Sequence, residues 1–376
     1  MATPCCSFEL TARFDAARVG VLHLPNGDVP TPCFMPVGTR GTVRGVDPLE
    51  LRQTGASMVL ANTYHLWERP GEHTVAALGG VRAFMGWDGP VLTDSGGYQV
   101  FSLRDRTKVT EEGVRFRSGL DGTLRNLTPE VSVRIQETLG VDVAMAFDEC
   151  IEVPATYERV AKSTERTTRW LHRGLAAREH ADRTALFGIV QGGLFEELRA
   201  AHAQELSALN LDGYAIGGLS VGEGHEAMMQ MVDVTTPRLP QDRVRYLMGV
   251  GHPHDIVQAV LRGVDLFDCV LPSRAGRHAH AYTSVGRLNL KNVKFAVDRG
   301  PVDPACACTT CARFSRGYLR HLFQSQEQLG ARLLSIHNLH YYQHIMARLR
   351  AAIAASGEGM GALAEEARRA SVAASD

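Results

Sequence analysis

Short apolar runs recur along the chain as far as residue 267, and each ends at a glycine or a polar side chain. Eight of them stand out, at residues 33–37, 58–61, 91–92, 141–147, 186–190, 214–216, 246–248 and 264–267. Runs that are short and continuously apolar are typical of parallel strands buried on both faces. We therefore predict eight buried strands.

Helical patterns lie between several of these runs. The clearest begins at Thr128, a capping residue, continues with Pro129 in the first turn and ends at Gly140. Thr or Ser before a helix, Pro at its start and Gly after its end are common helix boundaries. A second helix is predicted from Pro253 to Gly263. Eight strands alternating with helices predict an α/β protein with a (β/α)8 TIM barrel.

Polar residues and glycines follow these predicted strands directly. In a TIM barrel the carboxyl ends of the strands meet at one rim, which carries the active site. We therefore predict a functional site at this rim, although loops of any protein also carry polar residues. The residues concerned are Asn62, Asp94, Ser95, Asp148, Glu149, Gln191, Gly192, Gly193, Gly217, Gly218, Gly249 and Asp268.

Composition fits a water-soluble protein of 376 residues, with 44% hydrophobic and 22% charged residues. Apolar runs stay well short of the roughly 18 residues that a membrane-spanning helix needs. The first twenty residues have neither a basic leader nor an apolar segment, so we expect no secretory signal and a cytoplasmic location.

The net charge is −1, but one stretch is strongly basic. Residues 274–320 contain nine Lys or Arg against Asp298 and Asp303. Such a surplus suits binding to a phosphate backbone. A solvated basic face fits the charge equally well.

Three of the eight cysteines cluster, at Cys306, Cys308 and Cys311. With a histidine they form a Cys3His set, which suits a closed tetrahedral Zn²⁺ site of structural type, one ion per chain. His337 is the expected fourth ligand, and spacing alone leaves His340 and His344 as rivals. Three thiols next to an unrelated histidine would be the alternative without metal.

These patterns divide the chain into three predicted parts. Residues 8–275 form the catalytic barrel, and residues 276–350 form an inserted or C-terminal zinc-binding subdomain with a closing helix. Residues 351–376 are rich in Ala and Glu and are expected to form a low-complexity helix that ends in a loose tail. Residues 103–127 are a second predicted insertion.

Several longer motifs occur in order from about Phe8 to about Leu349. Together they resemble the bacterial type of tRNA-guanine transglycosylase, or queuine tRNA-ribosyltransferase. They are Thr93 to Ser102, Phe147 to Cys150, Ile189 to Gly193, Gly217 to Glu223, Phe267 to Arg274, and the cysteine cluster with His337-Asn338-Leu339.

The resemblance implies a pentosyltransferase of queuosine biosynthesis that works through a covalent enzyme–tRNA intermediate. Asp268 would be the nucleophile that attacks the ribose C1′ and expels guanine. Asp94 would be the general acid and base. A carboxylate can bond to a carbon with oxocarbenium character and later leave it, so the residue type suits the task.

The resemblance also implies how the base is bound. The substrate-binding residues would be Ser95, Tyr98, Asp148, Cys150, Gln191, Gly218, Leu219, Val221, Glu223 and Met248. Asp148 can accept hydrogen bonds from the N1–H and amine of a guanine-like ring. Tyr98 and Met248 would stack on its two faces, although either could simply fill the core.

Within the family, bacterial members insert 7-aminomethyl-7-deazaguanine (preQ1) in place of the wobble guanine of tRNAs with a G-U-N anticodon. Val221 and Cys150 resemble the bacterial pattern. Glu223 and the Leu219 carbonyl resemble the acceptors for the aminomethyl group. Arg274 and Arg277 would bind RNA, but Ala275 and His278 stand where the family usually has asparagines. A homodimer is also implied.

Two other functions deserve comparison. A non-catalytic tRNA-binding partner subunit would lack the catalytic aspartates, whereas this chain has Asp94 and Asp268. A barrel hydrolase with catalytic zinc would need an open metal site at the strand ends, whereas the cysteines follow the last predicted strand.

Overall fold

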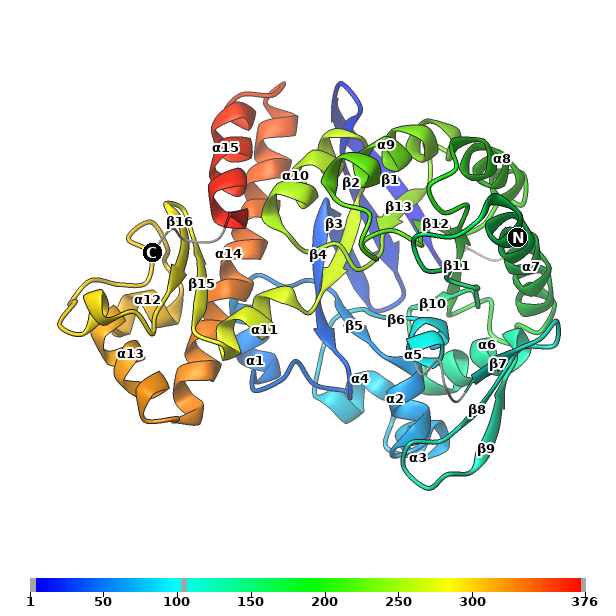
Figure 1. The fold of residues 1–376 in the computed structure, drawn as a ribbon, viewed down its shortest axis with the longest axis horizontal. Coiled ribbons are helices and arrows are strands. Elements are labelled where there is room, and N and C mark those ends of the chain that lie inside the picture. Colours follow the sequence, from blue (N-terminus) through cyan, green and yellow to red (C-terminus); the bar gives the residue numbers. More distant parts are fainter. Residues whose placement is uncertain (1–4, 103–106, 373–376) are drawn as a thin grey trace.

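The computed structural model describes residues 5–102 and 107–372. Within these residues eight parallel strands close into a barrel, so the predicted (β/α)8 fold is confirmed (Figure 1). The strands are β4 (Cys33–Gly38), β5 (Val59–Ala61), β6 (Val91–Thr93), β10 (Val143–Met145), β11 (Ala185–Val190), β12 (Gly213–Ile216), β13 (Val244–Leu247) and β14 (Leu266–Cys269). Each overlaps one predicted apolar run, with bounds that differ by up to two residues.

Both faces of the barrel wall are buried, which explains why the strands are apolar throughout. In β11, Phe187 and Ile189 point into the core inside the barrel, whereas Leu186 and Val190 pack in the core between barrel and helices. Alternate residues of one strand therefore serve two cores.

Helices connect the strands and surround the barrel (Figure 1). The predicted helix α6 begins with the Thr128 hydroxyl capping the Val131 N–H and ends at Gly140 in the left-handed conformation. The helices up to the last strand are α1 (Pro48–Gln53), α2 (Thr63–Glu68), α3 (Glu72–Ala77), α4 (Gly80–Met85), α5 (Gly97–Ser102), α6 (Pro129–Leu139), α7 (Tyr157–Ala176), α8 (Glu196–Ser207), α9 (His225–Thr235), η2 (Thr236–Arg238) and α10 (Pro253–Leu261).

Two small antiparallel sheets are added to the barrel. The sheet β1 (Ser7–Phe14), β2 (Ala17–Leu24) and β3 (Gly27–Thr31) precedes it and was not predicted. Leu22, Leu24 and Val29 from this sheet belong to the core inside the barrel, so the sheet closes the end where the strands begin. The predicted insertion contains β7 (Thr107–Val109), β8 (Val114–Arg117) and β9 (Leu124–Leu127); residues 103–106 lie outside the described residues.

The residues after the barrel form a subdomain beside it, drawn in yellow and orange in Figure 1 with its last helix in red. Its long helix α14 contacts α11, α12 and β15 on one side and β1, β2 and β4 on the other, so it joins the two parts. The elements are α11 (Leu271–Arg277), β15 (His280–Thr283), β16 (Gly286–Asn289), η3 (Val293–Phe295), α12 (Thr309–Arg313), α13 (Arg316–Gln324), α14 (Gln328–Ala354) and α15 (Met360–Ser371).

The C-terminal stretch, for which we predicted a helix that ends in a loose tail, is largely helical as far as Ser371. Helix α14 runs past residue 350 to Ala354, and α15 then packs against α10. Leu363, Ala367 and Ala370 are buried at helical spacing, a pattern that the high alanine content conceals. Residues 373–376 lie outside the described residues. The three-part division of the chain stays a prediction.

None of the described helices is both long and apolar enough to cross a lipid bilayer.

Candidate active site

A cavity of about 350 Å³ opens at the carboxyl ends of the barrel strands. Residues that follow seven different strands reach it, as expected for the rim of a TIM barrel. The predicted site residues among its walls are Asp94, Ser95, Tyr98, Asp148, Cys150, Gly218, Leu219, Val221, Met248, Asp268 and Arg274. Gln191, Glu223 and Arg277 are not part of the cavity wall, but each lies beside residues that are.

Asp94, directly after β6, is held by several neutral donors. Oδ1 accepts the backbone N–H of Thr63 at 3.0 Å and of Gly96 at 3.2 Å. Oδ2 accepts from the side-chain amides of Asn62 and of Gln99, the latter at 3.1 Å. Burial nevertheless raises the pKa of Asp94 to about 7, and the negative charge of Asp268 contributes. An acid with this pKa can both give and take a proton near neutrality.

Asp268, the penultimate residue of strand β14, has one anchored and one accessible oxygen. Oδ1 accepts the Tyr246 hydroxyl at 2.6 Å and the Gly249 N–H at 2.7 Å. Among the described residues no donor lies within hydrogen-bond distance of Oδ2. Burial raises the pKa of Asp268, while the two donors lower it. The carboxylate is thus fixed through one oxygen and presents the other to the cavity.

Asp148, which follows β10, faces the cavity between two other predicted residues. Its Oδ2 accepts the Gln191 side-chain amide at 2.6 Å, and its Oδ1 accepts the Ser95 hydroxyl at 3.4 Å. Burial raises the pKa of Asp148 to about 6, against the lowering effect of these two hydrogen bonds. The side chain is therefore a buried acceptor without a cationic partner.

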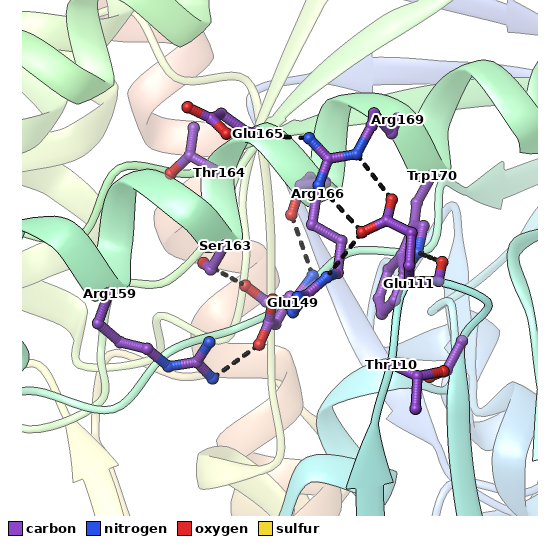
Figure 2. A network of polar contacts seen from close by, with 12 residues as sticks. Thr110, Glu111, Glu149, Arg159, Ser163, Thr164, Glu165, Arg166, Arg169 and Trp170 are labelled. Atoms are coloured by element: carbon purple, nitrogen blue, oxygen red, sulfur yellow. Dashed lines mark hydrogen bonds and ion pairs between the residues drawn. The ribbon is translucent and has the colours of Figure 1, made fainter.

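Glu149, the next residue, fixes the backbone beside Asp148 (Figure 2). Its fully buried carboxylate contacts Arg159 at 2.7 Å and Arg166 at 2.6 Å, both from α7. Its N–H donates to the Thr167 hydroxyl at 3.1 Å. This network ties the loop after β10 to the outer helix.

The same network reaches the inserted sheet (Figure 2). Glu111, in the turn between β7 and β8, contacts Arg169 at 2.7 Å and Arg166 at 3.4 Å. The Trp170 indole N–H donates to the Glu111 carbonyl at 2.8 Å. The insertion is therefore joined to the base of the loop that carries Asp148.

Tyr98 and Met248 stand on the cavity wall in different settings. Tyr98, on α5, is 60% exposed, so its ring does not fill the core. Met248, just after β13, is half-buried and also packs against the core inside the barrel. Met248 thus combines the core contact and the cavity contact that were considered as alternatives.

The loop after β12 forms another part of the wall. Gly218 has φ +65°, and a Cβ there would lie 2.4 Å from Oε1 of Gln191, so a side chain would strain the backbone and displace the Gln191 amide. Glu223 accepts the N–H groups of Ser220 and Val221, the latter at 2.9 Å, and so fixes the loop.

Cys150 faces this loop across the cavity, where burial raises the pKa of its thiol to about 12. The thiol is therefore neutral.

Arg274 on α11 lies at the cavity mouth, with Arg277 one turn further along the helix. The pKa of Arg277 is lowered by burial and by the positive charges of Arg44 and Arg274. Within the described residues none of these three arginines forms an ion pair. Clustered cations without carboxylates favour an anionic ligand.

The predicted metal ligands come together in the subdomain, away from the cavity. The ligand atoms of Cys306, Cys308, Cys311 and His337 lie within 4.8 Å of one another. Nδ1 of His337 is 3.3 Å from the Cys311 sulfur, and its Nε2–H donates to the Tyr282 carbonyl at 2.9 Å. This second contact orients the ring with Nδ1 toward the thiols.

The chemistry of this donor set fits a metal ion. Sulfur atoms around a tetrahedral zinc stand about 3.8 Å apart when each Zn–S bond is about 2.3 Å, which agrees with the cluster. His340 lies 3.4 Å from Cys306 through its own Nδ1 but is not part of the four-residue group. His337 is therefore the better fourth ligand, and the group has no open position for a reaction.

Sequence reasoning missed several side chains that support the acids. Tyr246 was interpreted only as part of a buried strand, and Thr63 and Gln99 were not singled out. A tyrosine near the carboxyl end of a barrel strand was the one available signal, because its hydroxyl needs a polar partner when buried.

Comparison with known proteins agrees with this geometry. The family model described as queuine tRNA-ribosyltransferase matches residues 14–370. A queuine tRNA-ribosyltransferase of Cereibacter sphaeroides is 53% identical over 364 residues, covering 97% of both chains. Those of Geobacillus kaustophilus and Zymomonas mobilis are 51% and 50% identical, covering 94% and 93% of this chain and 93% and 92% of their own. The chain therefore belongs to the queuine tRNA-ribosyltransferase family.

Proposed function

We propose that this protein replaces the wobble guanine of tRNAs with a G-U-N anticodon by preQ1, through a covalent intermediate on Asp268. Membership of the family makes the chain a tRNA-guanine transglycosylase, a pentosyltransferase. The proposal concerns the base, the tRNA and the residues that act. Three aspartates around one cavity, which neutral donors alone hold among the described residues, carry it.

Asp268 acts as the nucleophile. Its Oδ2 attacks the ribose C1′, the bond from C1′ to the base nitrogen N9 breaks, and its electron pair goes to guanine. Asp94 donates a proton to the departing base. Anchoring by Tyr246 and Gly249 supports this role, since it leaves Oδ2 accessible.

The second half of the reaction reverses the roles. Asp94 takes the N9 proton of the incoming base, N9 attacks C1′, and the Asp268 carboxylate leaves. Two displacements at one carbon retain its configuration and give ping-pong kinetics. A pKa near 7 supports this double role for Asp94.

Asp148 accepts hydrogen bonds from the N1–H and the exocyclic amine of guanine or preQ1, a pair of neighbouring donors that adenine lacks. Gln191 and the Gly218 N–H donate to the ring carbonyl oxygen, Ser95 supports Asp148, and Tyr98 and Met248 contact the faces of the ring.

The aminomethyl group of preQ1 meets the Leu219 carbonyl and Glu223, both acceptors for an ammonium. Val221 and the neutral Cys150 narrow the cavity here, which disfavours the larger base queuine.

At the cavity mouth and one helical turn beyond it, Arg274 and Arg277 bind RNA phosphates, and the absence of carboxylate partners for them among the described residues supports this. The target base must leave its stack to reach the buried acids, which costs less in an anticodon loop than in a duplex. We do not favour a non-catalytic partner subunit, since both catalytic aspartates line the cavity.

The metal group holds one structural Zn²⁺ per chain, which fastens the basic subdomain to α14. Cys306, Cys308, Cys311 and His337 would supply all four ligands. Elemental analysis should find about one zinc per folded chain. A fully folded, active and metal-free protein would contradict the assignment. The active protein is further proposed to be a homodimer, which sedimentation at assay concentration would test.

Base exchange tests the function directly. Wild-type protein should incorporate labelled guanine into unmodified tRNA with a G-U-N anticodon, and preQ1 should replace it irreversibly while queuine does not. Val221→Gly should gain queuine incorporation and keep guanine exchange. Incorporation of queuine by the wild type, or of neither deazaguanine, would overturn the choice of base.

A further inference from the structure

We propose that Arg199 is a positioning residue that fixes and polarises the Gly217–Gly218 peptide, so that the Gly218 N–H can bind the carbonyl oxygen of the reacting base. The inference rests on the proposed function and deepens it, because it adds a residue outside the cavity wall to the recognition of the base.

Arg199 lies in the first turn of α8 and is completely buried. Its guanidinium donates only to backbone carbonyls. Nε and Nη2 donate to the Gly193 carbonyl at 3.0 and 2.8 Å, and Nη1 and Nη2 donate to the Gly217 carbonyl, both at 3.2 Å. Among the described residues no carboxylate lies within ion-pair distance of Arg199. One side chain thus joins the loops after β11 and β12.

The Gly217 carbonyl determines where the neighbouring N–H points. In a trans peptide the C=O and the following N–H point in opposite directions, and the bond between Gly217 and Gly218 is not among the cis peptides. With its carbonyl directed at Arg199, the peptide directs the Gly218 N–H toward the cavity that both glycines line. Within the described residues this N–H has no hydrogen-bond acceptor.

A second residue of α8 supports the other donor to the base. His202, one turn after Arg199, accepts the Gln191 backbone N–H on its Nδ1 at 2.9 Å. Burial lowers the pKa of His202 to about 4, so the ring stays neutral and can accept. One face of α8 therefore orients both groups that would donate to the base oxygen.

Burying the Arg199 guanidinium without a carboxylate partner is costly, because the charge loses its contact with water. Such a cost suggests a function for the charge. Burial lowers the pKa of Arg199 to about 10, so the group is still charged at neutral pH. Its charge strengthens the peptide dipole that points at the cavity. When the glycosidic bond breaks, guanine carries extra electron density on its carbonyl oxygen, and a polarised N–H stabilises that state more than the bound substrate.

The binding of two free bases, guanine and 6-thioguanine, distinguishes this positioning role from simple structural support. 6-Thioguanine keeps the N1–H and the amine of guanine but replaces the oxygen by sulfur, a weaker hydrogen-bond acceptor. In Arg199→Met the affinity for guanine, measured by calorimetry, should fall about tenfold, and that for 6-thioguanine less than about threefold. Guanine exchange at saturating base should fall about 10- to 100-fold.

Further variants keep the test valid if Arg199→Met folds poorly. Arg199→Lys keeps the charge and should retain most of the preference for guanine over 6-thioguanine. Arg199→Gln keeps a donor without the charge and should lose more of the preference than Arg199→Lys. Equal losses of affinity for both bases, or identical behaviour of Lys and Gln, would overturn the proposal.

Arg245 provides a matched control at the other end of the barrel. It is also buried, donates to the carbonyls of Leu239 and Gly263, and has a pKa lowered to about 10 by burial. Arg245→Met should lower the melting temperature without changing the preference between the two bases. A wild type that binds neither base would instead refute the proposed function and leave Arg199 unassigned.

Discussion

Asp265 at one end of the barrel and three aspartates at the other end are held in opposite ways. At the end where the strands begin, Asp265 contacts the buried guanidinium of Arg18, with Nε 3.1 Å from Oδ1, and accepts the Arg245 N–H at 2.7 Å. At the rim, Asp94, Asp148 and Asp268 accept hydrogen bonds from neutral donors alone within the described part of the chain. A cation therefore compensates the charge of Asp265, whereas no cation contacts these three rim aspartates in that part of the chain.

The difference separates stability from function. A buried carboxylate paired with arginine has a fixed charge and little reactivity, whereas one held by neutral donors can titrate, bond to carbon or accept from a ligand. Even neighbours differ in this way, because Glu149 is neutralised by two arginines and Asp148 is not. Uncompensated acids at the rim lower the stability of the folded protein, and the same lack of compensation makes them reactive.

The largest effects should follow from Asp268→Asn at the rim and from Asp265→Asn at the other end of the barrel. Asp268→Asn should lower base exchange by on the order of 10⁴-fold or more, because the nucleophile is lost. Its unfolding free energy should stay close to that of the wild type, since the side chain keeps its shape. Exchange assays and urea unfolding measure the two quantities.

Asp265→Asn is the matched control. It should cost about 3–5 kcal/mol of stability by leaving the Arg18 charge unpaired, while the folded fraction keeps its exchange rate. If Asp265→Asn removed exchange in folded protein, or Asp268→Asn retained it, the division between the two ends would be wrong.

A smaller effect is expected at Asp148. Asp148→Asn should weaken guanine binding about 10- to 100-fold, because one charged acceptor for the two ring donors is lost. Glu149→Gln, next to it, should weaken guanine binding less than about threefold, since the Glu149 carboxylate is bound by two arginines of α7 and is not part of the cavity wall. Calorimetry with free guanine compares them, and equal losses would contradict distinct roles for the neighbours.

The smallest effect concerns pH. Because the pKa of Asp94 is raised from 3.8 to about 7, the folded protein binds this proton more tightly than the unfolded chain. The free energy of unfolding should therefore fall as pH rises from about 4 to about 7, and stay lowered above that range.

Asp94→Asn removes this titration. Between about pH 4.5 and about pH 8, stability should shift in favour of the variant by on the order of 2 kcal/mol relative to the wild type. Urea unfolding at a series of pH values measures the free energy of unfolding of both proteins. If the two free energies changed in parallel with pH, Asp94 would not titrate in this range and the prediction would be wrong.

Much of this architecture could be predicted from sequence. The barrel strands followed from apolar runs, and α6 from its Thr128 cap and Gly140 end, because local chemistry determines them. The metal group followed from three clustered cysteines, although only the structure selects His337 over His340. The N-terminal sheet was missed because its strands alternate weakly and gain stability from the barrel core.

Tertiary contacts explain the remaining differences. Nothing near Arg199 in the sequence indicates that it reaches the Gly217 carbonyl, eighteen residues away. Similarly, the Tyr246 hydroxyl and Asp268 meet only because β13 and β14 are neighbours in the barrel. Such pairs depend on closure of the barrel and cannot be read from local patterns.

Isolation of the covalent intermediate tests the central claim most directly. Wild-type protein incubated with unmodified tRNA without free base, then denatured and digested, should yield a peptide joined to RNA through the Asp268 side chain. Asp268→Asn should yield none. An adduct on another residue, or exchange with inverted configuration at C1′, would contradict the account.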